Sequence, residues 1–190
     1  MKGTTTRIMQ KGFTLVELLI VAIILAILAA IVVPQFASTT TDAQEAALRS
    51  NLSAIRGALA LYRQQHGEYP ALNAATGGVC SGTAGTGAED TRQAIVDQLT
   101  RYTNANGQSC TRQDGGSFPF GPYLDGDDLP ANPVTQDNAI AIVIDTDAAA
   151  GDLGMQGTGA GLGWRYDTTS GKFIANDTDT DSQGTRYDAY

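Results

Sequence analysis

The sequence predicts an α+β protein, in which the second half of a long N-terminal helix packs on a small antiparallel β-sheet. Three observations lead to this prediction. The stretch from Leu18 to Val33 has no polar side chain. After Asp42, apolar residues continue on one side only, at the spacing of a helix. Short stretches with the composition of strands follow in the C-terminal third.

The N-terminal apolar run is long enough to cross the roughly 30 Å of hydrocarbon in a bilayer as one helix. Lys2, Arg7 and Lys11 precede it, and the next basic residue is Arg49. Because positive residues stay on the cytoplasmic side, we expect a single-pass membrane protein with its N-terminal segment in the cytoplasm and its C-terminal domain outside. Glu17 interrupts the run, and a carboxylate placed in lipid is costly enough to need a specific role.

The string GFTLVELLIVAIILAILAAIVVPQF, preceded by basic residues, closely resembles the N-terminus of type IV pilins and type II secretion pseudopilins over Lys11 to Phe36. The resemblance implies that a membrane-embedded prepilin peptidase cuts after Gly12 and that the new terminal residue, Phe13, is N-methylated. It also implies that Glu17 aligns subunits during filament assembly. The implied location is the bacterial inner membrane, followed by a periplasmic or cell-surface filament. The expected organisation is a leader peptide over 1–12, a transmembrane and assembly helix over 13–34, and a globular domain over 35–190.

A physical argument for Glu17 agrees with this resemblance. Cleavage before Phe13 creates an α-amino group near the membrane depth of a neighbouring subunit's Glu17. A buried carboxylate is tolerated when a cation pairs with it. The alternative is that Glu17 only reaches up to the membrane interface in an ordinary anchor. Gly12 suits the cleavage because a residue without a side chain allows close approach to the backbone.

From Asp42 onward the expected helix becomes amphipathic, and its apolar stripe consists of Leu48, Leu52, Ile55, Leu59 and Tyr62. Arg49, Arg56 and Arg63 lie on another face. Pro34 predicts a kink within the helix. Gly67 predicts the helix end and Pro70 prevents continuation. Phe13 to His66 therefore form a nearly continuous helix about 80 Å long.

The segment after the long helix predicts a loop over Ala71–Gly87 and a short helix over Glu89–Tyr102. Cys80 and Cys110 then lie outside the cytoplasm, where a disulfide is the default expectation. The stretch GPYLDGDDLPANPVT resembles the loop that precedes the sheet in pseudopilins and related proteins, although it lacks the Trp-Gly pair often found next.

Strands are predicted at Ala139–Asp145, Leu162–Asp167 and Lys172–Ala175, and the link Thr168–Gly171 predicts that the last two form a hairpin. The polar segment Asn176–Tyr190 predicts a solvated tail or an edge segment. Within it Asp177, Asp179, Asp181 and Asp188 have the spacing of EF-hand positions 1, 3, 5 and 12, which makes Ca²⁺ a candidate ligand. A serine replaces the turn glycine, an aspartate the final glutamate, and no helices flank the loop.

Composition excludes several functions. Without residues 1–12 the net charge changes from −8 to −11, because three basic and no acidic residues are lost. Such a surface repels nucleic acid. No catalytic constellation is recognisable, because the only histidine, His66, falls at a helix end, where a cap or surface role is expected. The glycine-rich run Gly151–Gly163 contains no lysine and lies beside aspartates, so it does not indicate a phosphate loop.

The sequence therefore predicts a structural subunit of a type IV pilus-like or type II secretion pseudopilus filament, and not an enzyme. Expected partners are further copies of the chain, the prepilin peptidase, the inner-membrane assembly platform, minor pilins or pseudopilins, and the membrane. No nucleic acid is expected. The alternative is a membrane-anchored surface module that binds a ligand or DNA and never polymerises. A filament subunit sediments as fibres from sheared cells, whereas an anchor stays with the membranes.

Overall fold

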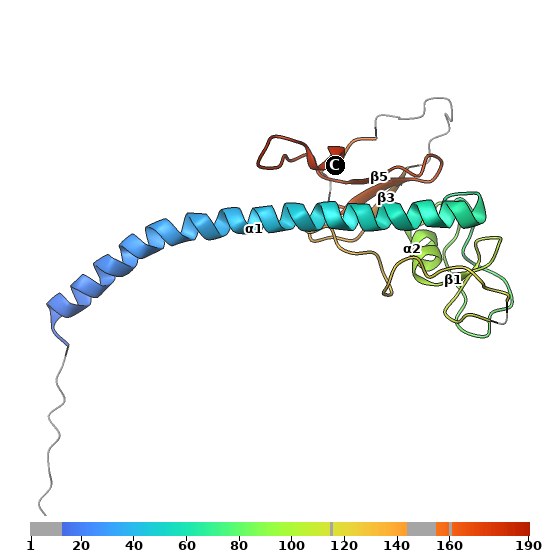
Figure 1. Ribbon diagram of the computed structural model, residues 1–190, viewed down its shortest axis with the longest axis horizontal. Helices are drawn as coiled ribbons and strands as arrows, with labels where there is room; N and C mark the ends of the chain where they lie inside the picture. The colour runs from blue at the N-terminus through green and yellow to red at the C-terminus, as the bar shows by residue number, and fades with distance from the viewer. Residues whose placement is uncertain (1–12, 115, 144–154, 160) are drawn as a thin grey trace, which may run out of the picture. The chain divides into compact units, whose positions relative to one another are not determined.

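The computed structural model describes residues 13–114, 116–143, 155–159 and 161–190. Two helices, α1 (Leu15–His66) and α2 (Arg92–Thr100), carry most of the regular structure. The strands and the final 3₁₀ turn are β1 (Tyr102–Thr103), β2 (Ser109–Cys110), β3 (Ile140–Val143), β4 (Trp164–Asp167), β5 (Phe173–Ala175) and η1 (Tyr187–Ala189). Together they form the expected α+β fold, which is pilin-like (Figure 1).

The chain divides into two compact units, Met1–Asp42 and Ala43–Tyr190. In the first unit, Leu15–Val32 is long and apolar enough to cross a membrane, and none of it is buried against other parts of the chain. A helix that is apolar on all sides suits lipid or other apolar helices rather than water. α1 does not end at Pro34 but continues as one helix of 52 residues.

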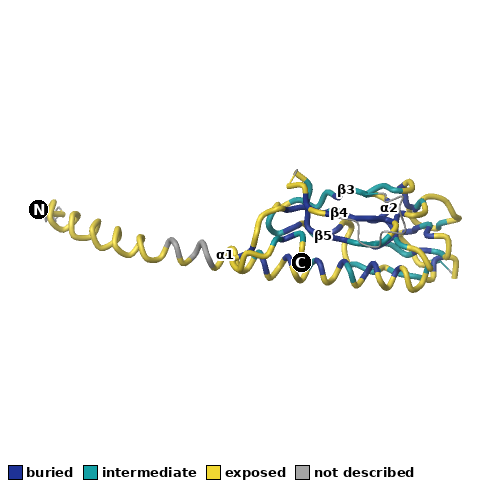
Figure 2. Tube along the Cα trace, turned by 90° about the horizontal axis from the view of Figure 1, so that it is seen from above, coloured by how far each residue is buried: buried dark blue, intermediate teal, exposed yellow. Residues whose placement is uncertain are grey.

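The second half of α1 supplies one side of the hydrophobic core. All five residues of the predicted stripe are buried, with Leu48 and Ile55 fully enclosed. Figure 2 shows buried positions on α1 only in this second half, alternating with exposed ones. The helix ends as predicted, because Gly67 adopts a left-handed conformation (φ 81°) and its amide donates to the Arg63 carbonyl at 2.8 Å.

The three-stranded sheet has the order β3-β4-β5 and packs its large aromatic residues into the same core. The predicted hairpin is confirmed, since β4 and β5 are antiparallel. The pairing of β3 departs from the purely antiparallel arrangement that we expected, because β3 runs parallel to β4. A parallel neighbour needs a crossover of a dozen or more residues, and the connection between Val143 and Trp164 has that length. The C-terminal end of the strand predicted to reach Asp145 lies outside the described residues.

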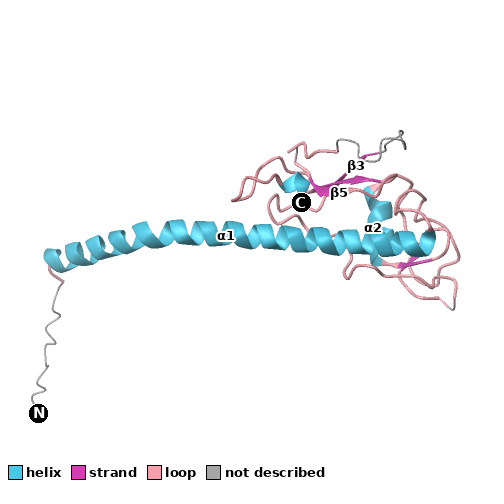
Figure 3. Ribbon diagram, turned by 45° about the horizontal axis from the view of Figure 1, so that its top comes forward, coloured by secondary structure: helices cyan, strands magenta, loops and turns pink. Residues whose placement is uncertain are grey.

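The helix predicted over Glu89–Tyr102 is shorter in the structure. α2 begins only after Thr91, whose side chain accepts a hydrogen bond from the Ala94 amide as an N-cap. Asp90 has a φ of 54° and therefore cannot belong to the helix. Tyr102 lies in β1, which pairs antiparallel with β2. Figure 3 shows α2 and the loops around it near the C-terminal end of α1.

A disulfide joins Cys80 to Cys110, with the two Cα atoms 5.8 Å apart. Cys110 is the last residue of β2 and is fully buried. The bridge therefore fastens the irregular segment after α1 to the β1-β2 pair.

The interpretation of Asn176–Tyr190 as a solvated tail was wrong. Asn176, Asp177, Asp181 and Tyr187 are all buried, and an isolated bridge pairs Thr180 with Arg186. The aspartates in this segment are compatible with burial because they accept hydrogen bonds, from nearby amides and, for Asp181, from Arg49 on α1 as well.

Candidate assembly sites

The first candidate site is the start of α1, where Thr14 and Glu17 bond to each other. The Thr14 amide and Oγ1 donate to Glu17 Oε2 at 2.9 and 2.8 Å, and the Glu17 amide donates to Thr14 Oγ1 at 3.2 Å. This reciprocal arrangement is a capping box, which satisfies amides that the first helical turn leaves unpaired. Phe13 precedes the box and is 81% exposed. Gly12 and the leader lie outside the described residues.

Glu17 has a local structural role that sequence reasoning did not identify. The signal was present, because Thr14-Leu15-Val16-Glu17 has the spacing of a capping box. Among the residues that the structure describes, the carboxylate accepts bonds from Thr14 alone, and it stays exposed, surrounded by exposed apolar side chains. It can therefore cap the helix and still meet a cation on another molecule.

The four aspartates of the candidate calcium set are engaged separately. Asp181 accepts from Arg49 and from the Tyr190 hydroxyl, and Asp188 accepts from Arg186 and from the Gly157 amide. The Asp177 side chain accepts from the amide of Asp179. The Asp179 side chain makes no hydrogen bond or ion pair with the part of the chain that the structure describes. Among the described residues, no three histidine, cysteine or acidic side chains gather in a way that could hold a metal ion.

Hydrogen bonds set the charge of two of these aspartates. The Tyr190 hydroxyl, followed by two backbone amides and Arg49, holds the pKa of Asp181 below its ordinary value. Burial alone would raise the pKa of Asp188, but the bonds from Arg186 and Gly157 outweigh burial and lower it. Burial and the bond to Asp181 raise the pKa of Tyr190 to about 12. Near neutral pH the segment therefore holds ionised carboxylates against a neutral tyrosine.

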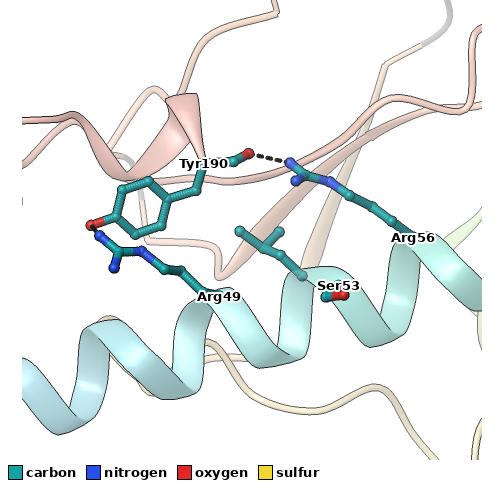
Figure 4. Close-up of a pocket in the computed structure, with 5 residues that line it drawn as sticks. Arg49, Ser53, Arg56 and Tyr190 are labelled. Carbon is teal, nitrogen blue, oxygen red and sulfur yellow. Dashed lines mark hydrogen bonds between the residues drawn. The ribbon is translucent and has the colours of Figure 1, made fainter.

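A basic pocket lies between α1 and the C-terminal segment, and we use this name for the cavity lined by Arg49, Leu52, Ser53, Arg56 and Tyr190. Its volume is about 370 Å³. Figure 4 shows both guanidinium groups reaching from α1 to Tyr190. Arg49 donates to the tyrosine hydroxyl at 2.9 Å, and Arg56 donates to its main-chain oxygen at 2.5 Å. The sequence placed the arginines on one face, but nothing in the pattern indicated that Tyr190 lies against them.

His66 is half-buried and contacts other side chains, whereas a cap or an exposed position was expected. Its ring stacks on Tyr62 with centroids 4.0 Å apart, and Nε2 lies 3.0 Å from both Thr103 Oγ1 and the Tyr123 hydroxyl. Burial lowers the pKa of His66, so the ring is neutral at physiological pH. These contacts join the end of α1 to β1, which is a structural role.

The fold and its N-terminal helix define a pilin-like α+β protein, and comparison with known proteins agrees. A family profile described as "Prokaryotic N-terminal methylation motif" matches residues 7–33. The chain is 34% identical over 110 residues to the type IV narrow pilus major component PilA5 of Thermus thermophilus, covering 56% of this chain and 89% of that protein.

Two further relatives match over shorter stretches. The type II secretion system core protein G of Pseudomonas aeruginosa is 43% identical over 61 residues, which is 32% of this chain and 43% of that protein. A fimbrial protein of Neisseria meningitidis is 39% identical over 69 residues, 36% of this chain and 41% of that protein. The chain thus spans less than half the length of these two relatives. No solved structure matches the chain significantly.

The chain therefore belongs to the family of type IV pilins and type II secretion pseudopilins. Members of this family are structural proteins rather than enzymes. Membership supports a role as a filament subunit and agrees with an N-terminal helix that anchors the protein in a membrane.

Proposed function

We propose that this protein is the structural subunit of a type IV pilus-like or type II secretion pseudopilus filament and polymerises through its N-terminal helix. One observation carries the proposal: apart from Glu17, Leu15–Val32 is apolar on every side, and none of it is buried within the chain. Such a surface needs lipid before assembly and apolar neighbours afterwards. Packed N-terminal helices of other subunits supply those neighbours, and the small residues Ala22, Ala26 and Ala29 allow close approach.

In the proposed sequence of events, the protein first inserts into the inner membrane with residues 1–12 in the cytoplasm. The prepilin peptidase then cuts between Gly12 and Phe13, and Phe13 is N-methylated. The new amine pairs with Glu17 of the adjacent subunit, which sets the register of helices in the filament. The Cys80–Cys110 disulfide supports a globular domain outside the cytoplasm, because disulfides persist in oxidising compartments.

The proposed partners follow from this sequence of events. They are the prepilin peptidase, the assembly platform of the inner membrane, minor pilins or pseudopilins, and further copies of the chain. Nucleic acid is not among them, because a mature chain with a net charge of −11 repels phosphate.

The test is to express the full chain with the peptidase and assembly platform, shear the cells and sediment the supernatant. We expect fibres whose subunit begins at Phe13 by mass spectrometry, with a mass that includes one methyl group. Uncleaved chains in the fibres would contradict the proposed processing. A processed chain that always remains with the membranes would favour the non-polymerising surface module.

A further inference from the structure

The basic pocket is unusual because the mature chain carries a net charge of −11. Arg49 and Arg56 are seven residues apart on α1, about two helical turns, so both point to the same flank. Ser53 lies between them and is exposed. The pocket therefore brings together a hydroxyl and two guanidinium groups, one of them paired with Asp181, on a chain that otherwise repels copies of itself.

Both arginines retain donors that nothing in the described part of the chain uses. Arg49 donates through Nη2 only, to Asp181 and Tyr190, and its side chain is 53% exposed. Arg56 donates through Nε and Nη2, to the main-chain oxygens of Phe173 and Tyr190. The Nη1 groups of both have no recorded partner, and a guanidinium holds such donors in a plane that matches a carboxylate.

An acidic loop with complementary charge exists on the same chain. Asp125 and Asp127 are exposed, and no hydrogen bond or ion pair is recorded for either within the described residues. Asp128, by contrast, is already held by Arg92 at 2.6 Å. The free carboxylates of the acidic loop, which we define as Asp125–Asp127, are thus available to another molecule.

The basic pocket and the acidic loop lie on opposite flanks of α1. Arg49 and Arg56 bind the C-terminal segment, whereas Asn51 donates to the Ala131 carbonyl, a few residues beyond the acidic loop. Asn51 follows Arg49 by two residues, which places it about 200° around the helix. In Figure 1 the C-terminal segment (red) lies above α1, whereas part of the yellow segment around residue 120 lies below it.

We propose that the basic pocket of one subunit receives the acidic loop of a second copy of this chain. Each subunit then offers one pocket and one loop on opposite flanks, so the contact is head-to-tail and leaves both ends free to continue. Contacts of this kind produce open helical assemblies. The proposal rests on the proposed filament function, to which it adds a second, electrostatic contact between globular domains.

A charge reversal tests the contact at exposed positions that have no recorded role in the fold. Ser53→Glu places a carboxylate between the arginines and should lower the filament yield about tenfold, because like charges then meet across the interface. Asp125→Lys with Asp127→Lys should do the same. Combining all three changes should restore most of the yield. Ser50→Glu, an exposed position on α1 outside the pocket, is the matched control and should leave assembly unchanged.

Cysteine cross-linking of the full chain in membranes separates this proposal from the filament function. Ser53→Cys with Asp127→Cys should give a reducible ladder of oligomers, whereas either cysteine alone gives at most a dimer. Ser50→Cys with Asp127→Cys is the control and should give no ladder. A ladder without fibres would support the contact and overturn the filament role. Fibres without a ladder would overturn the contact alone, and the absence of both would overturn both.

The pocket could instead be filled by an acidic segment of another protein or by a free anion. In either case Ser53→Glu would lower the yield, but lysines in the acidic loop would not restore it and no ladder would form. That combination of results would overturn the proposal.

Discussion

The guanidinium of Arg49 donates to the carboxylate of Asp181 at 3.1 Å across 132 positions of sequence. The Asp181 side chain is almost fully enclosed and also accepts from the Tyr190 hydroxyl at 2.7 Å. The amides of Gln183 and Thr185 each donate to its other oxygen at 2.8 Å. One buried carboxylate thus fixes a turn of the C-terminal segment and holds that segment on α1.

Stability should depend on the charge of Asp181. Its pKa is lowered in the folded protein, so its charge contributes its full stabilisation above the pKa of an aspartate in the unfolded chain, about 3.9. This stabilisation is lost as the pH falls from the pKa of the unfolded state towards the pKa of the folded state. Asp181→Asn should therefore melt at a lower temperature than the wild type at pH 7. The difference between the two melting temperatures should shrink as the pH approaches 3. The melt can be followed by fluorescence of Trp164, the only tryptophan, which is fully buried.

The control for this measurement is Asp127→Asn, an exposed carboxylate with no recorded partner within the described residues. It should melt like the wild type at both pH values. An Asp181→Asn deficit that stays the same from pH 7 to pH 3 would indicate lost packing rather than lost charge.

The pair of Arg49 and Asp181 also explains why sequence reasoning failed on the C-terminal segment. A stretch with four aspartates is read as solvated, because isolated buried carboxylates are costly. One partner of Asp181, Arg49, lies on α1, and the pattern of residues 176–190 contains no information about it. The parallel pairing of β3 was missed for a related reason, since strand composition does not specify the direction of a neighbour.

Other parts of the fold were predictable because their cause is local. The stripe from Leu48 to Tyr62 repeats with the period of a helix, and all of it is buried in the structure. The hairpin of β4 and β5 followed from a four-residue link between two strand-like stretches. At the N-terminus, Glu17 was singled out because it interrupts an apolar run, but its bond to Thr14 was not anticipated.

Truncation of the core stripe should destabilise the globular domain strongly. Leu59 is 2% exposed, so Leu59→Ala removes buried methyl groups and leaves a cavity, at a cost of about 2–5 kcal/mol. Leu61 lies on the same helix but is 46% exposed, so Leu61→Ala should cost less than about 0.5 kcal/mol. Denaturant unfolding followed by Trp164 fluorescence measures both. Equal losses for the two variants would contradict the assignment of the core face.

The disulfide should also contribute measurably. Cys80 and Cys110 are separated by 30 residues, and in the chain-entropy model closing such a loop stabilises the folded state by about 3–4 kcal/mol. Reductant should therefore lower the melting temperature of the wild type. A variant with Cys80→Ala and Cys110→Ala should have a lower melting temperature than the wild type without reductant, and reductant should not change it. Two free thiols in denatured protein from the cell envelope would show that the bridge does not form.

Calcium binding by Asp177, Asp179, Asp181 and Asp188 stays a prediction that a melt can decide. If the site exists, calcium at a hundredfold excess over its dissociation constant should stabilise the domain by about 2.7 kcal/mol, and magnesium should not. Asp179→Asn removes an exposed carboxylate that has no side-chain partner among the described residues, and it should abolish the effect. A melting temperature that changes with neither calcium nor chelator would show that the site does not bind calcium.

Glu17 has two explanations that different substitutions separate. As the capping box, it accepts from Thr14 and stabilises the first turn of α1. Glutamine serves equally well in this motif, so Glu17→Gln preserves the cap. As the partner of a cation in an apolar filament core, Glu17 is needed for its charge, which glutamine lacks.

If the charge pairs with the Phe13 amine of the next subunit, Glu17→Gln and Glu17→Leu should both prevent assembly. Losing one partner of a buried ion pair typically costs about 3–5 kcal/mol, which exceeds the gain from easier membrane insertion near a helix end. Insertion and cleavage at Gly12 should survive in both variants. Filaments are counted and the mature N-terminus is sequenced in cells that express each variant as the only copy. If Glu17→Gln assembles normally and Glu17→Leu does not, the cap is the essential function and the pairing must be abandoned.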